Sequence, residues 1–382
     1  MATARKAEAA TQGQAAQPRH PTGILPSQSL RAVIRAGEII AEERITEAQV
    51  QPSSLDLRLG ATAYRVKASF LPGPKATVAE KIETFAMHAI DLSEGAVLEK
   101  GCVYIVPLME SLKLSSRIYG IANPKSSIGR IDIFTRLITD HTSEFDRIRA
   151  GYEGPLYVEV SPRAFSVVVR QGSRLNQLRL RRGSHAYSDP ALRRLHQQVP
   201  LIDRDLASED LSAGIPLSID LPLAAEGGGI IGYKARPHSG LIDVDKVAAY
   251  PVEDFWEPLT GRPKGGLVLN PDDFYILASK EAVTVPPDHA AEMVAYDTLV
   301  GEFRVHYAGF FDPGFGHGEA GGTRAVLEVR SHEVPFVLDD GQRVGRLIYE
   351  RLLDQPDKLY GPGIGSSYQL QGLALSKHFV AG

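Results

Sequence analysis

The chain repeats part of itself, and this internal repeat is the feature that most constrains its fold. Residues 104–110 recur as residues 275–281, with Tyr, Ile and Glu kept at one constant offset. Residues 157–160 (Tyr-Val-Glu-Val) recur as residues 326–329 (Val-Leu-Glu-Val), and each copy is followed by a glycine at the same spacing. Shared strand patterning can imitate a repeat, but matched spacing over this length favours two domains of one fold.

The length of the chain agrees with this division, because 382 residues exceed what one compact core usually holds. We expect the first domain to span about residues 23–183 and the second about 216–353, joined by a linker at 184–215. Residues 1–22 are rich in Ala and Gln and lack the apolar stretch of a signal peptide. They are predicted to be a disordered arm or a remnant of the start site.

Most of the chain reads as short β-strands. Apolar and polar residues alternate with a period of two in four segments, which are 55–59, 103–107, 156–160 and 166–170. Gly, Pro, Asp and Asn interrupt these segments at short intervals, a pattern typical of an all-β barrel or sandwich. Two short helices are also expected, one capped by Ser27 or Ser29 and ending near Gly37, and one at 189–196 in the linker.

The charge balance and the cysteine count exclude some classes of partner. The formal net charge is −4, so nothing suggests a polymeric nucleic acid, whereas a small anion needs only a local basic pocket. No apolar run approaches the roughly 20 residues of a membrane span. The single cysteine, Cys102, allows neither a disulfide framework within the chain nor a cysteine zinc site, and we expect a cytoplasmic protein.

A short motif at 317–319 (His-Gly-Glu) matches the His-x-Glu of zinc deaminases. That mechanism also needs a Cys-x-x-Cys pair, which a chain with one cysteine lacks. We therefore expect no catalytic zinc, and His317 is interpreted as a solvated loop residue.

The segment 123–130 (Asn-Pro-Lys-Ser-Ser-Ile-Gly-Arg) is the first candidate for chemistry. Its hydroxyl and cationic groups can donate many hydrogen bonds to phosphate oxygens, and these groups belong to Lys125, Ser126, Ser127 and Arg130. Gly129 would let the backbone come close to a partner. Taken alone, the pattern also fits a polar turn between two strands.

Two glutamates, Glu159 and Glu328, each lie inside an apolar strand segment. A carboxylate flanked by Val, Leu or Tyr can be desolvated, which suits it to act as a general base. The alternative is a strand residue that faces outward, because neighbouring strand residues alternate faces.

Residues 310–316 (Phe-Phe-Asp-Pro-Gly-Phe-Gly) form the third candidate. Asp-Pro-Gly makes a tight turn. A loop of this kind can hold the edge of a ring with backbone groups and with Asp312, although a simple hairpin turn is the alternative.

In their order and spacing, the motifs of the first domain resemble those of bacterial dCTP deaminases of the long, internally duplicated type, within the dUTPase-like superfamily. Residues 51–60 (Gln-Pro-Ser-Ser-Leu-Asp-Leu-Arg-Leu-Gly) are similar to the opening strand of that family. Residues 125–130 resemble its Arg-Ser-Ser-x-x-Arg segment, and residues 148–154 resemble its Ile-Asp-x-Gly-aromatic-x-Gly turn. Glu159 then falls on the catalytic glutamate of the family.

The second domain carries a different part of the same pattern. Ala308, Phe311 and Asp312 match the loop that reads the base in this family, and Glu328 matches its glutamate. The resemblance therefore implies a mainly β protein with two tandem dUTPase-like domains, each a distorted, jelly-roll-like β-barrel, and a few short helices.

The end of the chain resembles the C-terminal arm that closes over the nucleotide in this family. The similar residues are 367–372 (Ser-Tyr-Gln-Leu-Gln-Gly). Residues 354–382 are accordingly expected to form such an arm, with Tyr368 and Gln371 at the nucleotide.

The chain departs from the family pattern in both domains. Lys125 stands where arginine is usual, which keeps the charge and loses the bidentate fork. The turn aspartate of the first domain is replaced by Arg149. In the second domain, the constant offset replaces the Ser-Ser-Arg set by Asp297, Thr298 and Gly301.

These losses are complementary, since the first domain keeps the Ser-Ser-Arg set and the second keeps the turn aspartate. Sites of this superfamily lie between neighbouring subunits and draw residues from both. We therefore hypothesise one composite site per pair of domains. The first domain would contribute Lys125, Ser126, Ser127 and Arg130, and the second domain with the arm would contribute Ala308, Asp312, Glu328 and Gln371.

The resemblance implies hydrolysis of dCTP to dUTP and ammonia, in the supply of pyrimidine deoxynucleotides. Glu328 would be the general base, with Glu159 as the alternative. Ser126 and the carbonyl of Ala308 would position the water, and Arg130 would stabilise developing charge or bind phosphate. Mg²⁺ would be carried by the triphosphate without a dedicated cage of protein ligands.

Other functions remain open at this stage. A dUTP pyrophosphatase, or a bifunctional deaminase and pyrophosphatase, would use an extra aspartate in the turn, and residues 312–315 hold no second acid. A nucleotide-binding protein without catalysis would also fit degraded motifs.

His306, two residues before Ala308, has either a direct role or ordinary strand packing. Because the superfamily assembles domains in threes, a homo-oligomer with a threefold domain arrangement is expected.

Overall fold

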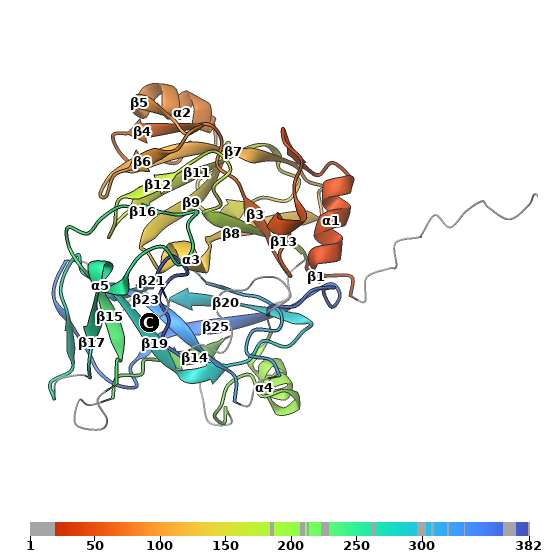
Figure 1. Ribbon diagram of the computed structural model, residues 1–382. Helices are drawn as coiled ribbons and strands as arrows, with labels where there is room; N and C mark the ends of the chain where they lie inside the picture. The colour runs from red at the N-terminus through yellow and green to blue at the C-terminus, as the bar shows by residue number, and fades with distance from the viewer. Residues whose placement is uncertain are drawn as a thin grey trace, which may run out of the picture.

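The computed structural model describes most of the chain, and within this part the protein is mainly β with a few short helices, as predicted (Figure 1). The described residues are 20–183, 187–206, 211, 214–222, 229–261, 264–295, 303–306, 309–318, 321–331, 333–361 and 372–380. Among them, no helix is both long and apolar enough to cross a bilayer.

The helices are short, and they are α1 (Ser27–Arg35), α2 (Val78–Phe85), α3 (Ser126–Gly129), α4 (Asp189–Gln198) and α5 (Val252–Phe255), with a 3₁₀ turn η1 (Glu47–Gln49). The predicted helices correspond to α1 and α4. The predicted serine cap of α1 is wrong, because the N-cap is Pro26 and no side chain caps the helix. The hydroxyl of Ser27 instead donates to the carboxylate of Asp357.

Strands of the first half of the protein (residues 20–183) form two main sheets. One has the order β1-β13-β8-β10, with β3 also paired to β13, and its strands are β1 (Gly23–Ile24), β13 (Asn176–Arg182), β8 (Ile118–Pro124), β10 (Arg147–Ile148) and β3 (Leu55–Leu57). The other has the order β5-β4-β7-β11-β9, with β2 also paired to β7, and its strands are β5 (Ala86–Asp91), β4 (Thr62–Val66), β7 (Val103–Lys113), β11 (Glu153–Pro162), β9 (Ile133–Thr139) and β2 (Ile39–Ala41).

Strands of the second half (described residues from 187 to 361) repeat this arrangement in part. One sheet has the order β14-β25-β20-β22, with β14 (Ile215–Ser218), β25 (Arg343–Arg351), β20 (His289–Ala295) and β22 (Phe310–Phe311). Another has the order β17-β15-β19-β23-β21, with β17 (Trp256–Leu259), β15 (Gly232–Ala235), β19 (Phe274–Val283), β23 (Thr323–Ser331) and β21 (Phe303–His306). A two-stranded sheet joins β18 (Leu267–Leu269) to β24 (Phe336–Leu338).

The repeat seen in the sequence is also a repeat of strand register. In the first half, Glu159 of β11 stands opposite Ile105 of β7. In the second half, Glu328 of β23 stands opposite Ile276 of β19. The matched sequence segments therefore occupy equivalent places in the two halves, which explains why their spacing agrees.

The two halves pack directly on one another, with α3 at their junction (Figure 1). A small sheet crosses the boundary, because β16 (Ile242–Asp243) of the second half pairs with β12 (Val167–Val169), which also pairs with β6 (Ala96–Leu98). One apolar cluster likewise contains Trp256 and Phe274 together with core residues of the first half. Side chains of the two halves can therefore share one site.

Candidate active site

The predicted phosphate segment lies at the junction of the two halves. Lys125 follows the end of β8 and is the N-cap of α3, and the helix then runs from Ser126 to Gly129. Ser127 and Arg130 are buried. The side chain that faces this helix from the second half is Glu328 of β23, which is 3% exposed.

Gly129 is the point of contact between α3 and Glu328. A Cβ atom placed on Gly129 would lie 2.5 Å from both carboxylate oxygens of Glu328. Real Cβ atoms do not approach oxygen so closely, so the carboxylate can occupy this place only because residue 129 has no side chain. The glycine in the motif thus admits the carboxylate of the other half, and the outward-facing alternative for Glu328 is wrong.

A buried ion pair fastens the same strand to the first half. Arg330, two residues after Glu328 on β23, donates from Nη2 to the carboxylate of Asp132, which follows α3. Arg330 Nη1 also donates to the carbonyl oxygen of Asp272 at 2.5 Å. Burial raises the pKa of Asp132 to about 6, against the lowering effect of Arg330. This pair holds Glu328 in register with α3.

The loop at 309–312 is also held by side chains of the first half. The backbone N–H of Gly309 donates to Asn123 Oδ1 at 2.8 Å. The hydroxyl of Ser53 donates to Asp312 Oδ1 at 2.6 Å, and Arg179 Nη2 lies 3.6 Å from the same oxygen. Burial raises the pKa of Asp312 above its usual range. The structure therefore brings Asp312 and Phe311, which is buried, to the same junction as α3.

The cations of the phosphate segment have protein partners. Lys125 Nζ pairs with the buried carboxylate of Asp56, and Arg174 Nη1 lies 3.5 Å from the same group. Arg130 Nη1 donates to the carbonyl oxygen of Ala374 at 3.0 Å. The sequence pattern did not single out Asp56 or Arg174, because each reads there as an ordinary polar residue of a strand or turn.

Residues 372–380 return to α3 near the end of the chain. The Ser376 hydroxyl donates to the carbonyl oxygen of Ser127 at 2.7 Å and lies 2.8 Å from His378 Nδ1. His378 Nε2 lies 2.9 Å from the carbonyl oxygen of Val244. Burial lowers the pKa of His378 to about 4. The predicted arm residues Tyr368 and Gln371, and Ala308 of the loop, lie outside the described residues.

Glu159, the equivalent of Glu328, has a different environment. It is buried, and its Oε1 accepts hydrogen bonds from Arg136 Nε at 3.0 Å and Arg136 Nη2 at 2.6 Å. Arg136 is also its neighbour in register on β9. In the second half, the residue in register with Glu328 is His306 of β21. The outward-facing alternative for Glu159 is therefore also wrong, and one guanidinium already neutralises this carboxylate.

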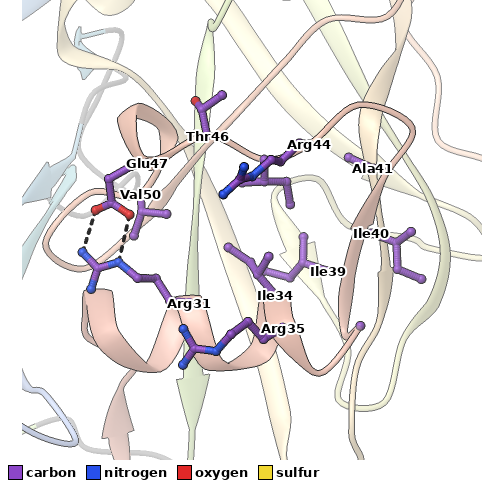
Figure 2. A pocket seen from close by; sticks show the side chains of 12 residues that line it. Arg31, Ile34, Arg35, Ile39, Ile40, Ala41, Arg44, Thr46, Glu47 and Val50 are labelled. Carbon is purple, nitrogen blue, oxygen red and sulfur yellow. Dashed lines mark hydrogen bonds and ion pairs between the residues drawn. The ribbon is translucent and has the colours of Figure 1, made fainter.

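Two cavities lie away from this junction. One of about 710 Å³ is bordered by α1, β2 and the following loop, with Arg31 paired to Glu47 at one end (Figure 2). The other, of about 330 Å³, lies beside the Arg149 turn. None of the predicted site residues lines either cavity.

Within the described ranges, no three His, Cys, Asp or Glu side chains cluster so as to hold a metal ion, and His317 is exposed.

Comparison with known protein families gives two matches that together cover most of the chain. Residues 21–184 match the model described as the 2'-deoxycytidine 5'-triphosphate deaminase (DCD) N-terminal domain. Residues 188–379 match the model described as the C-terminal domain of the same protein.

A solved structure agrees with these matches over its whole length. The crystal structure of 2'-deoxycytidine 5'-triphosphate deaminase from Agrobacterium tumefaciens is 55% identical in sequence, with a TM-score of 0.83. The similarity covers 88% of this chain and 100% of that chain.

Curated relatives are more distant. A protein of Beutenbergia cavernae named "dCTP deaminase, dUMP-forming" is 34% identical over 28% of this chain and 56% of its own length. One of Halobacterium salinarum with the same name is 35% identical over 27% of this chain and 52% of its own length. One of Haloarcula marismortui named "dCTP deaminase" is 28% identical over 48% of this chain and 89% of its own length. The chain thus spans about half the length of the first two relatives.

Proposed function

Since the chain belongs to the 2'-deoxycytidine 5'-triphosphate deaminase family, we propose that it is an enzyme that hydrolyses dCTP to dUTP and ammonia. The proposal places the reaction at the junction of α3 with Glu328 and the loop 309–312. This site is composite, because its two sides come from different halves of the chain.

One observation carries this proposal, namely the position of the Glu328 carboxylate against Gly129. The carboxylate of Glu328 is buried and fills the space beside Gly129. Such packing favours one fixed position of the carboxylate, as a general base requires. It lies next to the hydroxyl-bearing residues of α3, whose types suit the binding of phosphate and water. Glu159 is the alternative base, and its carboxylate is paired with Arg136.

The chemistry requires a water to attack C4 of cytosine. Glu328 takes a proton from this water while the oxygen bonds to C4, and it passes that proton to the ring nitrogen. The same carboxylate then takes the second proton from the C4 hydroxyl and gives it to the departing amine, so that C4 becomes a carbonyl carbon. The C4–N bond breaks and ammonia leaves. Ser126 and the carbonyl of Ala308 position the water, and Arg130 stabilises developing negative charge. General acid–base catalysis of this kind contributes about 100- to 10,000-fold in rate.

The proposed site needs no catalytic zinc, since proton transfer through Glu328 activates the water. Mg²⁺ carried by the triphosphate would screen its charge and would be held through the nucleotide without a cage of protein ligands. Lys125, Ser127 and Arg130 then bind the phosphates, with Tyr368 and Gln371 of the arm closing over the nucleotide.

A product assay tests the function. The protein is incubated with dCTP and Mg²⁺, and dUTP, dUMP, pyrophosphate and ammonia are separated and quantified. The expected result is one ammonia for each dUTP. Unchanged dCTP would refute the deaminase assignment. Tight dCTP binding in calorimetry would then indicate a protein that binds nucleotides without catalysis.

A second product remains a specific alternative, because two relatives are named dUMP-forming. Formation of dUMP and pyrophosphate in the same assay would show a bifunctional enzyme. We propose dUTP as the end product because the loop at 312–315 holds one acid only.

For the architecture, we propose two tandem dUTPase-like distorted barrels and an oligomer in which domains associate in threes. The repeated register of Glu159 and Glu328 supports a common fold for the two halves. Light scattering coupled to size exclusion measures the oligomeric mass.

A further inference from the structure

Strand β13 presents alternate side chains to the two halves of the protein. Leu178 and Leu180 are buried in the first-half core. Gln177, Arg179 and Arg181 have the opposite orientation, because strand residues alternate faces. Arg181 crosses to the second half, where it pairs with Glu292 at 3.1 Å and with Glu350. Arg179 crosses to the loop that carries Asp312.

Arg179 is fully buried, and its contacts converge on that loop. Nη2 donates to the Phe311 carbonyl oxygen at 3.4 Å and to Ser53 Oγ at 3.1 Å, and it lies 3.6 Å from Asp312 Oδ1. Nη1 donates to the carbonyl oxygen of Ala291 at 3.1 Å, and the guanidinium lies 4.0 Å from the centre of the Phe310 ring.

Such a group is costly to bury. Desolvation lowers the pKa of Arg179, whereas the carboxylate of Asp312 opposes this effect. Burial of a guanidinium is tolerated only where a carboxylate and further hydrogen bonds compensate for lost water. An apolar side chain of similar volume would stabilise the fold as well as a buried ion pair does. Stability therefore does not explain why an arginine lies beside Asp312.

We propose that Arg179 is a positioning residue that orients the Asp312 carboxylate toward the nucleotide. The inference rests on the proposed function, since Asp312 acts on the substrate and Arg179 does not touch it. Among the described residues, the contacts of Asp312 with Ser53 and Arg179 both reach Oδ1. This leaves Oδ2 to accept a hydrogen bond from a hydroxyl or amino group, and the side chain is 13% exposed.

The proposal can be tested through the pH at which the Asp312 carboxylate takes up a proton. Burial raises the pKa of Asp312, while Arg179 lowers it most strongly among the charges that face it. The other charges are Asp56, which raises this pKa, and Lys125, which lowers it. Removal of a cation at this distance raises a carboxyl pKa by about one unit or more. Without Arg179, Asp312 should therefore become protonated at a higher pH.

The test compares R179M, R179K and R181M in the full chain. Arg181 is the matched control, because it lies on the same face of β13 and pairs across the same boundary without contacting the loop. For each protein, kcat and KM for dCTP and the calorimetric Kd of dCTP are measured from pH 5 to pH 9. Circular dichroism and thermal melting report folding.

We expect R179M to raise KM and Kd for dCTP about tenfold and to move the acidic limb of kcat/KM upward by about one pH unit. R179K should restore the position of this limb because it restores the charge. R181M should lose thermal stability without any movement of the limb. If R179M and R181M gave the same pH profile, or if R179K failed to restore it, Arg179 would have only a structural role.

Failure of the proposed function gives a different result. If wild-type protein bound dCTP and did not convert it, the deaminase assignment would fail, while the pH dependence of Kd would still test Arg179. If wild-type protein did not bind dCTP at any pH, both conclusions would be overturned. Should R179M not fold, R179K provides the test, because lysine keeps the charge but cannot make the separate Nη1 and Nη2 hydrogen bonds of Arg179, and this loss should raise KM without moving the acidic limb.

Discussion

The carboxylate of Glu328 lies in the space that a side chain on Gly129 would fill, across the boundary between the two halves of the chain. A single methyl group on residue 129 would stand 2.5 Å from both carboxylate oxygens. This contact links the only glycine of the α3 segment to the glutamate of the other half. It makes the geometry of the proposed general base depend on the absence of one side chain.

Replacement of Gly129 by alanine should therefore impair catalysis. The carboxylate has to move, and a misplacement of about 1 Å can lower the rate about 100-fold. We expect G129A to fold and to lose kcat on that scale. The control is G265A, because nothing lies within 4 Å of a Cβ placed on Gly265. A G129A protein with the kcat of the wild type would show that Glu328 does not act from this position.

The two glutamates should respond differently to substitution by glutamine. E328Q removes the proposed base, so kcat should fall by about 100-fold or more. E159Q breaks the charge pair with Arg136 and should lower the melting temperature while kcat stays near that of the wild type. Steady-state kinetics and thermal melting of both variants check this. The assignment of the base would be reversed if E328Q were active and E159Q inactive.

The sequence could predict part of this site because local patterns report it. The alternating strands, the helix at 189–196 and the glycine before Arg130 were all readable from neighbouring residues. Glu159 and Glu328 could not be told apart in this way, since both lie in similar apolar segments. What separates them is visible only in the structure, where Glu159 pairs with Arg136 and Glu328 lies against Gly129.

Other parts of the site depend on contacts between distant segments. Ser53 meets Asp312 and Arg330 meets Asp132 only because the two halves pack together. Neither pair has a spacing that a local motif could reveal. The sequence does contain a pattern around Arg179, because arginines alternate with leucines along residues 178–182. When a strand is buried on both faces, its arginine side chains must be paired with polar groups of other segments. The alternation of arginine and leucine does not identify these groups.

The buried pair of Arg330 and Asp132 should stabilise the packing of the two halves against one another. R330M leaves a buried carboxylate without its cation, and this should lower the free energy of unfolding by about 3–5 kcal/mol. D132N in the R330M background should recover part of that loss. Denaturant unfolding in a double-mutant cycle measures the coupling. K280A, which breaks an exposed pair with Asp340, is the control and should cost less than about 1 kcal/mol. Equal losses for R330M and K280A would contradict the proposed role.

The attachment of residues 372–380 to α3 should weaken in acid. Burial lowers the pKa of His378 from 6.5 to about 4, so the unfolded chain binds a proton at a pH where the folded protein does not. Stability is then fully present above pH 6.5 and is lost as the pH falls toward 4. The two pKa values correspond to a loss on the order of 3 kcal/mol. The charges that face His378 are Lys377, Asp245 and Asp243.

Denaturant unfolding of the wild type and H378Q between pH 8 and pH 4 measures this effect. Glutamine cannot take up the proton, so the free energies of unfolding of the two proteins should converge as the pH falls from 6.5 to 4. The release of residues 372–380 also removes the contact of Ser376 with the Ser127 carbonyl oxygen and that of Ala374 with Arg130. KM for dCTP should therefore rise over the same interval in the wild type. Parallel stability curves for the two proteins would show that another group controls the acid sensitivity.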